Sequence, residues 1–440
     1  MATLGHKPDV VLVSVFGRGN WLAAELKNEG FSVTLIDLSG SMGRWAPEDW
    51  EGPFGLFRSE SLRPSQFSRL IEEDYQDAMD RGFAVWLKQG PLELTGPLTG
   101  FMLDRLDVSD ELRHYLMDFD SANESAKSQW RQMFQDRPFQ STWLAQLAHN
   151  LASPVFISSA QSVTRGRPLP LFSPLFVRRV TRRGREKSLD WLESIGVTVH
   201  RDAEAVDLNI QGRLMQGVEI QGKHSGFVGG ENFVWMLTGE ETAHCHSNLT
   251  AQLFPKGFVS PKWGWMRFRL RVQEGPYLDS MPGYFVLIND LCLPWSHANL
   301  SVVQKSVSAR DFDCWVRVPT NHRFQKEYLS NIGDELVRQF SERLPGSSPE
   351  VSEMPQDYKY DSSELGPPRF PVYEPEDIKN ISRTVASNLY FDGPELWELL
   401  DWTGQFSHQD KVLSQIIDWR VRKEKASAKS AQETSKEASL

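Results

Sequence analysis

The chain has few cysteines and no long apolar run, and each shortage excludes a class of protein. It contains only three cysteines in 440 residues. Because Cys245, Cys292 and Cys314 are odd in number and scattered, we expect no disulfide framework and a reducing, cytoplasmic compartment. No apolar run of about 18 residues occurs, and a strand pattern begins almost at the N-terminus. We therefore expect neither a transmembrane segment nor a signal sequence.

Positive charge is also scarce. The 48 lysines and arginines are outnumbered by 58 acidic residues, which gives a net charge of −10. No nucleic-acid partner is expected, because such partners need a broad basic surface. One local basic cluster is interpreted as the start of a solvated helix, with contact to an anion or a lipid headgroup as the alternative. It consists of Arg178, Arg179, Arg182, Arg183 and Arg185.

Familiar catalytic and metal motifs are missing as well. There is no nucleophile triad, paired catalytic acid motif or Walker-type phosphate loop. His244, Cys245 and His246 are potential metal ligands, but adjacent residues do not easily converge on one ion. No second pair has ligand spacing, so we expect no metal.

The most informative segment that is present is residues 10–37. A continuous apolar run over residues 10–13 is typical of a parallel strand covered on both faces. An amphipathic helix follows and ends at Gly30, and residues 31–36 form a second apolar strand. Asp37 closes that strand about 20 residues past the turn, where an acid accepts hydrogen bonds from a ribose. The pattern predicts the opening of a dinucleotide-binding fold.

The glycines of the phosphate-binding turn are incomplete. Counting back from the end of the helix and from the acid places the three glycine positions at Ser14, Phe16 and Gly19. The third glycine, which lets helix and strand pack closely, is kept. The benzyl group of Phe16 stands where backbone must approach a pyrophosphate. A looser register takes Gly17 and Gly19 as the first two glycines, but it shortens the helix and misplaces the acid.

Further patterns indicate a hairpin, a second sheet and several helices. The hairpin is expected over 206–210 and 215–221, and 61–150 is mostly helical in pattern. Residues 176–200 predict a helix ending at Gly196 and then a strand. Segments with strand patterns follow one another as in an antiparallel sheet, at 263–272, 284–288, 301–307 and 312–318.

Three later segments extend the opening pattern toward a known family. In residues 37–45 the acid is followed by a turn that keeps Gly43 and Arg44, with Met42 in place of a glycine. Residues 191–206 are expected to contain the end of a helix, then a strand, and then the segment that leads to Val206. The last segment, Asn388-Leu-Tyr-Phe-Asp-Gly-Pro-Glu and then Trp-Thr-Gly, spans residues 388–404. Together the four segments resemble the flavin-containing amine oxidase and phytoene desaturase superfamily, over roughly residues 8–420.

The resemblance implies FAD as cofactor and assigns several residues to it. The turn of Gly43 and Arg44 would lie against the flavin phosphates, and backbone around Val206 would face the adenine. In the C-terminal segment the family places backbone amides on the pyrophosphate and the flavin ring. Four residues match that pattern, namely Gly393, Glu395, Trp402 and Gly404. Pro394 does not match, because it has no amide hydrogen to give.

The departures from the family gather at phosphate positions, and two explanations stay open. They are Ser14, Phe16, Met42 and Pro394. Either FAD is bound in an altered way, or the fold has lost its cofactor and binds a protein partner or a hydrophobic ligand. The Rab escort and GDP-dissociation-inhibitor family is a precedent for the second. Our leading expectation is an FAD-dependent oxidoreductase acting on an apolar or amine-bearing small molecule.

Catalytic residues cannot be assigned from the sequence, because a flavin supplies the redox step itself. The family uses a lysine that holds a water near the flavin, and Lys256 and Lys262 lie in a suitable stretch, although each is also a typical surface lysine. Four tryptophans are candidates for aromatic walls around a substrate, with core packing as the alternative: Trp263, Trp265, Trp397 and Trp402. The substrate and any protein partner stay unidentified.

The predicted fold class is α/β, with a Rossmann-like FAD/NAD(P)-binding domain and a discontinuous second domain. We expect the first domain from residues 1–60, 176–250 and 375–421. The substrate-binding domain, 61–175 and 251–374, should combine helices with a mixed or antiparallel sheet. Residues 422–440 lack apolar anchors and predict a disordered tail.

Overall fold

The computed structural model describes two large sheets, two small ones and the helices that pack against them. The residues it describes are 7–45, 55–58, 83–87, 90–93, 123–126, 128–129, 175–178, 182–222, 225–273, 275, 278–289, 299–306, 310–356, 359, 371–372, 385–396 and 401–437. Within these ranges, no helix combines the length and the apolar character that a membrane crossing needs.

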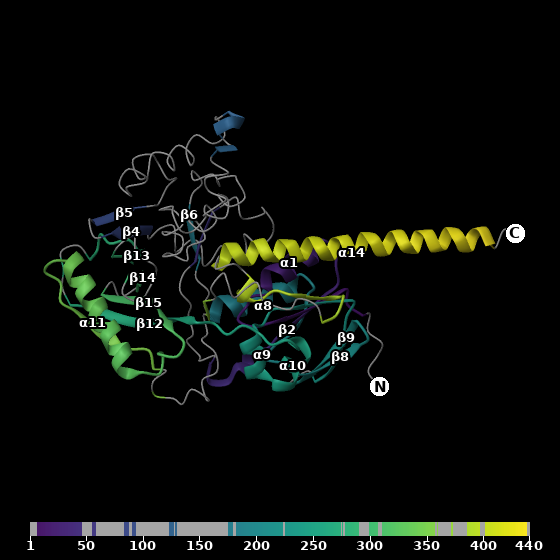
Figure 1. Ribbon diagram of the computed structural model, residues 1–440, viewed down its shortest axis with the longest axis horizontal. Coiled ribbons are helices and arrows are strands. Elements are labelled where there is room, and N and C mark those ends of the chain that lie inside the picture. Colours follow the sequence, from purple (N-terminus) through teal and green to yellow (C-terminus); the bar gives the residue numbers. More distant parts are fainter. Residues whose placement is uncertain are drawn as a thin grey trace.

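A five-stranded parallel sheet confirms the predicted Rossmann-like fold (Figure 1). Its order is β7-β2-β1-β11-β18, so the chain changes direction across the sheet between β1 and β11. The strands are β1 (Val10–Ser14), β2 (Val33–Asp37), β7 (Thr198–His200), β11 (Asn232–Trp235) and β18 (Leu389–Phe391). The expected pairing of the first two strands is confirmed, with Val10 opposite Val33.

Both faces of this sheet are buried, which explains the continuous apolar run of β1. Val10 and Leu12 belong to one hydrophobic cluster, whereas Val11 and Val13 belong to another. Side chains of a strand alternate between its faces, so each cluster covers one side. The first contains residues of α1 (Asn20–Asn28), α8 (Arg182–Ser194) and α14 (Asp401–Glu437). Gly30, with a φ of +80°, follows α1 as expected.

The other face packs against a small antiparallel sheet and two short helices. The predicted hairpin is present as β8 (Glu204–Gln211) and β9 (Leu214–Gln221), and β10 (Gly226–Gly229) pairs with β9. The helices α9 (Gly239–Cys245) and α10 (Ser247–Leu253) follow β11. This three-stranded unit carries the chain from β7 across to β11.

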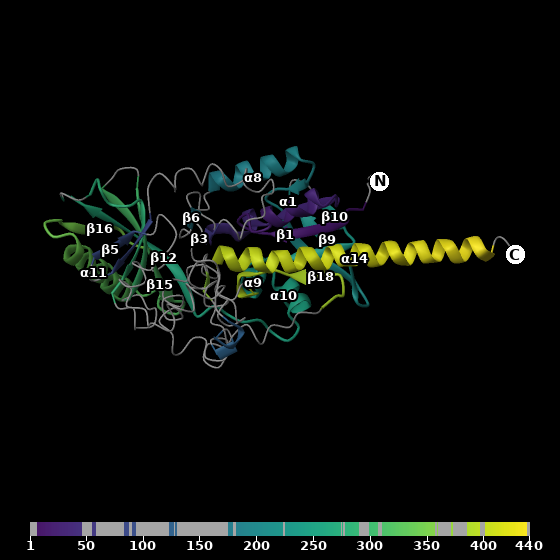
Figure 2. The ribbon, with the colours of Figure 1, turned by 90° about the horizontal axis from the view of Figure 1, so that it is seen from above.

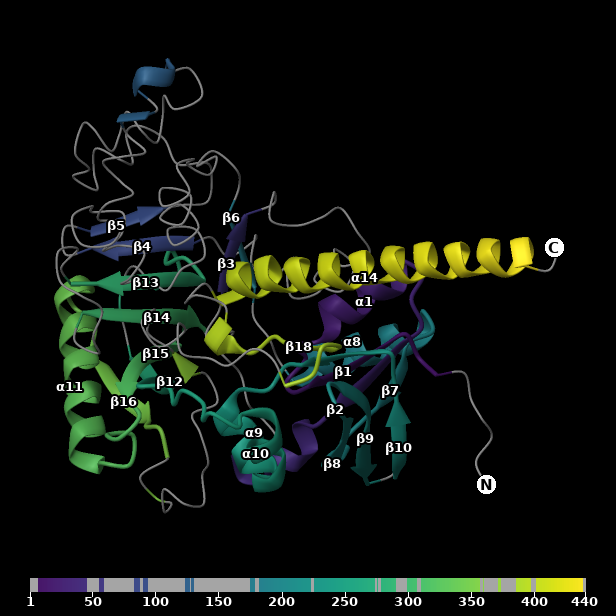
Figure 3. The ribbon, with the colours of Figure 1, turned by 45° about the vertical axis from the view of Figure 1, so that its right-hand side comes forward.

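A second, mixed sheet forms the other half of the molecule, with α11 (Lys326–Arg343) packed against it (Figure 3). Its antiparallel strands at 263–272, 284–288, 300–305 and 311–319 agree with the sequence patterns. In order it contains β16 (Pro349–Glu353), β12 (Trp263–Val272), β15 (Asp311–Pro319), β14 (Leu300–Lys305), β13 (Tyr284–Ile288), β4 (Phe83–Leu87) and β5 (Gly90–Glu93), with β17 (Pro371–Val372) beside β12.

Some strands lie where the sequence predicted other structure. β4 and β5 occur inside the mostly helical stretch 61–150, because β4 pairs in parallel with β13 about 200 residues later. β3 (Gly55–Arg58) and β6 (Leu175–Arg178) pair with each other. The helix expected from residue 176 therefore starts only at Arg182.

The disordered tail predicted from residue 422 is wrong as far as residue 437, since α14 continues to Glu437. Val412, Leu413 and Ile416 anchor the helix in the core, and it then propagates through lysine, glutamate, glutamine and alanine, which favour helix. Its side chains from 421 to 431 are nevertheless all exposed. Figure 2 shows this end of α14 projecting beyond the sheets.

Candidate functional site

The expected cofactor residues gather at the carboxyl edge of the parallel sheet. Ser14, Asp37, Trp235 and Phe391 end four of its strands. In open α/β sheets, ligands bind in the crevice outside the carboxyl ends of the strands, where the strand order reverses. The loops after β1, β2, β11 and β18 therefore form the candidate site.

In the turn between β1 and α1, the backbone N–H groups donate hydrogen bonds to acceptors within the protein. The Gly19 N–H donates to Ser14 Oγ at 2.8 Å, and the Phe16 N–H donates to Ser39 Oγ at 2.8 Å. The amides of Arg18 and Asn20 donate to the carbonyls of Val15 and Gly17. A dinucleotide-binding turn normally offers such amides to phosphate oxygens. Here Ser14, at the first glycine position, accepts the hydrogen bond of the Gly19 amide, at the third position.

Two bulky residues at glycine positions, Phe16 and Met42, belong to one buried cluster. Phe16 has a φ of +53°, a left-handed conformation that is costly for a residue with a side chain. Its ring is nevertheless buried, and Met42 is fully buried. The Cys245 thiol lies 3.7 Å from Met42 Sδ, and burial raises the pKa of that thiol to about 12. The apolar core therefore extends into the place where glycines would leave space.

Asp37, the acid expected to face a ribose, is a buried carboxyl that is hydrogen-bonded through one of its two oxygens. Its Oδ1 accepts hydrogen bonds from the Ser39 hydroxyl at 2.5 Å and the Ser39 amide at 3.2 Å. Its Oδ2 is buried without a hydrogen bond and lies 3.8 Å from Arg185 Nη1. Burial raises the pKa of this carboxyl, and the charge of Arg185 opposes the rise. One oxygen therefore stays available to accept a hydroxyl hydrogen.

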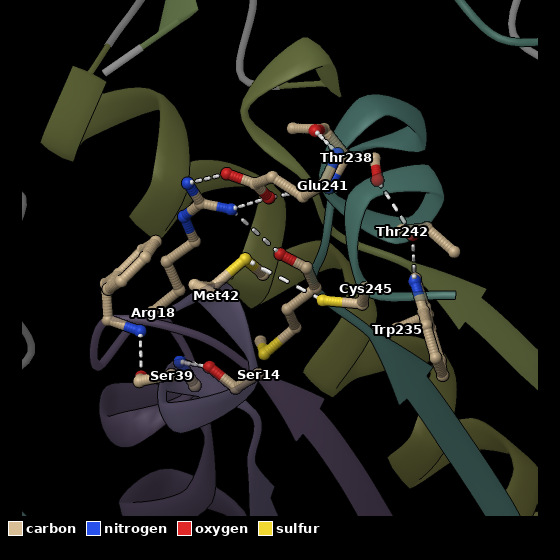
Figure 4. Close-up of polar contacts among 12 residues, drawn as sticks. Ser14, Arg18, Ser39, Met42, Trp235, Thr238, Glu241, Thr242 and Cys245 are labelled. Atoms are coloured by element: carbon tan, nitrogen blue, oxygen red, sulfur yellow. Dashed lines mark hydrogen bonds and ion pairs between the residues drawn. The ribbon is translucent and has the colours of Figure 1, made fainter. Parts of the chain in front are cut away.

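A buried ion pair joins the turn to the first turn of α9, the helix that follows β11 (Figure 4). Arg18 donates through both Nη atoms to Glu241, at 2.5 and 2.6 Å. Glu241 also accepts from the Thr238 amide, and its own amide donates to the Thr238 hydroxyl, which completes a capping box at the start of α9. The charge of Arg18 is thus compensated inside the protein. No sequence pattern indicates this pair.

A second polar network connects α14 to the same edge. His408 Nδ1 lies 2.9 Å from Asp392 Oδ1. The Gln409 amide nitrogen donates to Asp392 Oδ2 at 2.6 Å and to the Arg18 carbonyl at 3.0 Å. His408 has no evident partner in the sequence, but the structure provides one. Trp402 and Gly404, which match the C-terminal segment of the family, lie in the first turn of this helix.

Glu395 is a buried acid in η4 (Pro394–Leu396) beside this network. Its Oε2 is buried without a hydrogen bond. Burial, together with the negative charges of Glu241 and Asp392, raises the pKa of Glu395 to about 8, against the lowering effect of Arg18. A Cβ added at Gly393 would lie 2.3 Å from Glu395 Oε2, so the glycine makes room for this acid.

The remaining predicted residues lie on neighbouring elements. Gly43 and Arg44 are in η1 (Ser39–Trp45), which follows β2, and Val206 is half-buried in β8. Lys256 and Lys262 are exposed, as surface lysines are. Trp263 and Trp265 are half-buried on β12, and Trp397 lies outside the described residues. In the described part of the chain, no three His, Cys, Asp or Glu side chains gather as metal ligands.

Comparison with known proteins gives structural likeness alone. No family model and no curated protein sequence matches the chain. A solved structure of an oxidoreductase from Methanosarcina mazei superposes with a TM-score of 0.49 at 14% identity, covering 92% of this chain and 100% of that one. Putrescine oxidase bound to putrescine gives 0.46 at 12%, covering 94% and 99%. A geranylgeranyl bacteriochlorophyll reductase-like protein from Thermoplasma acidophilum gives 0.48 at 10%, covering 94% and 79%. These scores are too low to bear on the cofactor or the reaction, and the fold assignment rests on the strand order.

Proposed function

We propose that the chain binds FAD at the carboxyl edge of the parallel sheet and is a flavin-linked oxidoreductase. The observation that carries the proposal is Asp37 Oδ2. It is a buried carboxylate oxygen without a hydrogen bond, at the end of β2, and β2 is the neighbour of β1, where the strand order reverses. An unsatisfied buried acceptor costs free energy. A ribose hydroxyl would satisfy it, as in other dinucleotide-binding folds.

The two halves of the site fit a dinucleotide unequally. The acid fits a ribose, and Gly19 keeps α1 close to β1, as the fold requires. The amides of the turn do not offer the usual phosphate cradle, since four of them donate within the protein. FAD binding here therefore needs phosphate contacts other than those amides.

The residues of the chain contribute to the chemistry by positioning the bound groups and by holding a proton at Glu395. When bound, a flavin provides the redox step itself. Below pH about 8, Glu395 keeps its proton, and its carboxyl can donate a hydrogen bond at the edge of the site. We assign an apolar or amine-bearing small-molecule substrate to the second domain, residues 61–175 and 251–374, and we place the protein in the cytoplasm.

The direct test is the colour of the purified protein. Bound oxidised flavin absorbs at about 450 nm, and we expect that band to persist through gel filtration after incubation with FAD. Replacing Ser14 and Phe16 together by glycine should strengthen retention, because it releases the Gly19 amide and removes the benzyl group. Phe227→Gly is the matched control, since that phenylalanine is exposed on β10.

The second candidate is a cofactor-less binding protein of the same fold. The observation in its favour is the internally bonded turn, together with the buried Phe16 ring. A protein that is colourless, and that stays colourless with FAD even after both glycine replacements, would reject the oxidoreductase proposal. This second candidate would then take its place.

A further inference from the structure

Arg185 lies across the turn where a nucleotide phosphate is expected. A Cβ added at Gly17 would lie 3.4 Å from Arg185 Cγ, so the arginine stem packs directly on the turn. The guanidinium ends 3.8 Å from Asp37 Oδ2, and the side chain is only 9% exposed. The sequence predicts a solvated start of α8, but the side chain of one of its arginines, Arg185, is buried at the candidate site.

Arg185 and Asp37 are neighbours but do not hydrogen-bond to each other. Their separation of 3.8 Å exceeds hydrogen-bond distance. Arg185 Nε and Asp37 Oδ2 are both buried without a hydrogen-bond partner. One unsatisfied donor and one unsatisfied acceptor therefore belong to two neighbouring side chains. A ligand that carries an anionic acceptor next to a hydroxyl donor would satisfy both.

We propose that Arg185 and Asp37 form a subsite for the ribosyl phosphate part of a nucleotide. In it the guanidinium binds phosphate oxygens and Asp37 Oδ2 accepts a ribose hydroxyl. The proposal deepens the proposed function and uses the same edge of the sheet. A guanidinium presents its donors in a planar fork that matches phosphate geometry. It supplies the phosphate contact that the internally bonded amides of the turn do not.

The other arginine of the turn does not serve this purpose. Both Nη atoms of Arg18 already bind Glu241, and one also donates to the Met236 carbonyl. A phosphate at Arg18 would have to displace a buried carboxylate, whereas at Arg185 it meets a guanidinium with an unused donor. The positive charge for the phosphate therefore comes from α8 rather than from the start of α1.

The subsite should recognise any nucleotide with an adenosine diphosphate half, with or without a flavin. We would titrate the full-length protein with ADP by isothermal calorimetry, and repeat the titration with 2′,3′-dideoxy-ADP and with inorganic phosphate. The variants are Arg185→Gln and Asp37→Asn. Lys187→Gln is the matched control, because it removes the same charge from an exposed position on the same helix. Circular dichroism and thermal melting establish that each variant is folded.

We expect Arg185→Gln to weaken ADP binding about 10- to 100-fold, as loss of a charged hydrogen bond does, with Lys187→Gln unchanged. Wild type should prefer ADP over the dideoxy analogue, and Asp37→Asn should reduce that preference. Equal ADP affinity in wild type and Arg185→Gln would overturn the subsite while leaving FAD binding to its own test. ADP binding through Arg185 in a protein that never retains flavin would support the subsite and overturn the oxidoreductase proposal. A folded wild type that binds no ADP would overturn the subsite.

Discussion

Replacing Glu395 by glutamine should make the stability of the protein less dependent on pH. Burial raises the pKa of this carboxyl from its ordinary value of 4.5 to about 8 in the folded chain. In the unfolded chain the carboxyl is in water and titrates near its ordinary value. Between these two pH values the folded protein holds a proton that the unfolded chain has lost. Stability therefore falls as the pH rises through this window.

The size of the effect follows from the two pKa values. At about 1.4 kcal/mol for each pKa unit, a rise from 4.5 to about 8 corresponds to a loss of up to about 5 kcal/mol by alkaline pH. The stabilising contribution is complete below pH 4.5 and is gone above pH about 8. Glutamine has nearly the same shape and no titration. The stability of Glu395→Gln relative to wild type should therefore increase by up to about 5 kcal/mol across the window.

Urea denaturation followed by tryptophan fluorescence, at several pH values from 5 to 9, measures this difference, and the 15 tryptophans provide the signal. Any pH-independent effect of the glutamine side-chain amide on stability cancels, because the comparison uses only the change of stability with pH. Glu186→Gln removes an exposed carboxylate from α8 and should differ from wild type by less than about 0.5 kcal/mol throughout. A Glu395→Gln curve parallel to that of wild type would refute the reasoning.

Three further predictions concern the turn and the last helix. Arg18→Met leaves the Glu241 carboxylate buried without its ion-pair partner, and should lower the free energy of unfolding in urea by about 3–5 kcal/mol. Adding Glu241→Gln should recover much of that loss, and equal stabilities of the single and double variants would contradict this. Gly19→Ala should cost about 1–3 kcal/mol, because its Cβ would lie 3.0 Å from Met236 Sδ and Ser14 Cβ, and an unchanged melting temperature would show that the turn can relax. Deleting residues 423–440 removes exposed side chains and the ion pair of Lys423 with Glu231, so the melting temperature should move by less than about 2 °C; a drop of several degrees would mean that the helix end stabilises the fold.

The parts of the fold that the sequence predicted are those set by local pattern. β1, α1 and β2 follow one another within 28 residues, and the apolar runs, Gly30 and Asp37 define them without help from elsewhere. β4 could not be predicted this way, because its strand partner β13 is about 200 residues away. The end of α14 was misjudged for a different reason. Lack of apolar anchors predicts that a segment buries nothing, but it does not prevent a packed helix from propagating onward.

The candidate site shows the same division. The positions of Ser14, Phe16 and Asp37 at the first turn and at the end of β2 could be predicted, because the fold fixes their spacing. Glu241 is 223 residues from Arg18 in sequence, and no pattern in either segment indicates the pair. Arg185 belonged to a recognised basic cluster, but its path over Gly17 depends on how α8 packs beside α1. Long-range polar partners of this kind follow from tertiary packing and leave no periodic trace.

The strand order of the parallel sheet also bears on how the chain folds as it leaves the ribosome. The central strand β1 is made first, but its neighbour β11 begins at residue 232 and the edge strand β18 at residue 389. Pairings between such distant segments slow folding and leave apolar strands exposed in the meantime. The helix that covers one face of the sheet follows last of all. Asp37, the proposed ribose acid, is therefore synthesised early but acquires its surroundings only near the end of translation. A chain released before residue 416 would lack core anchors of α14.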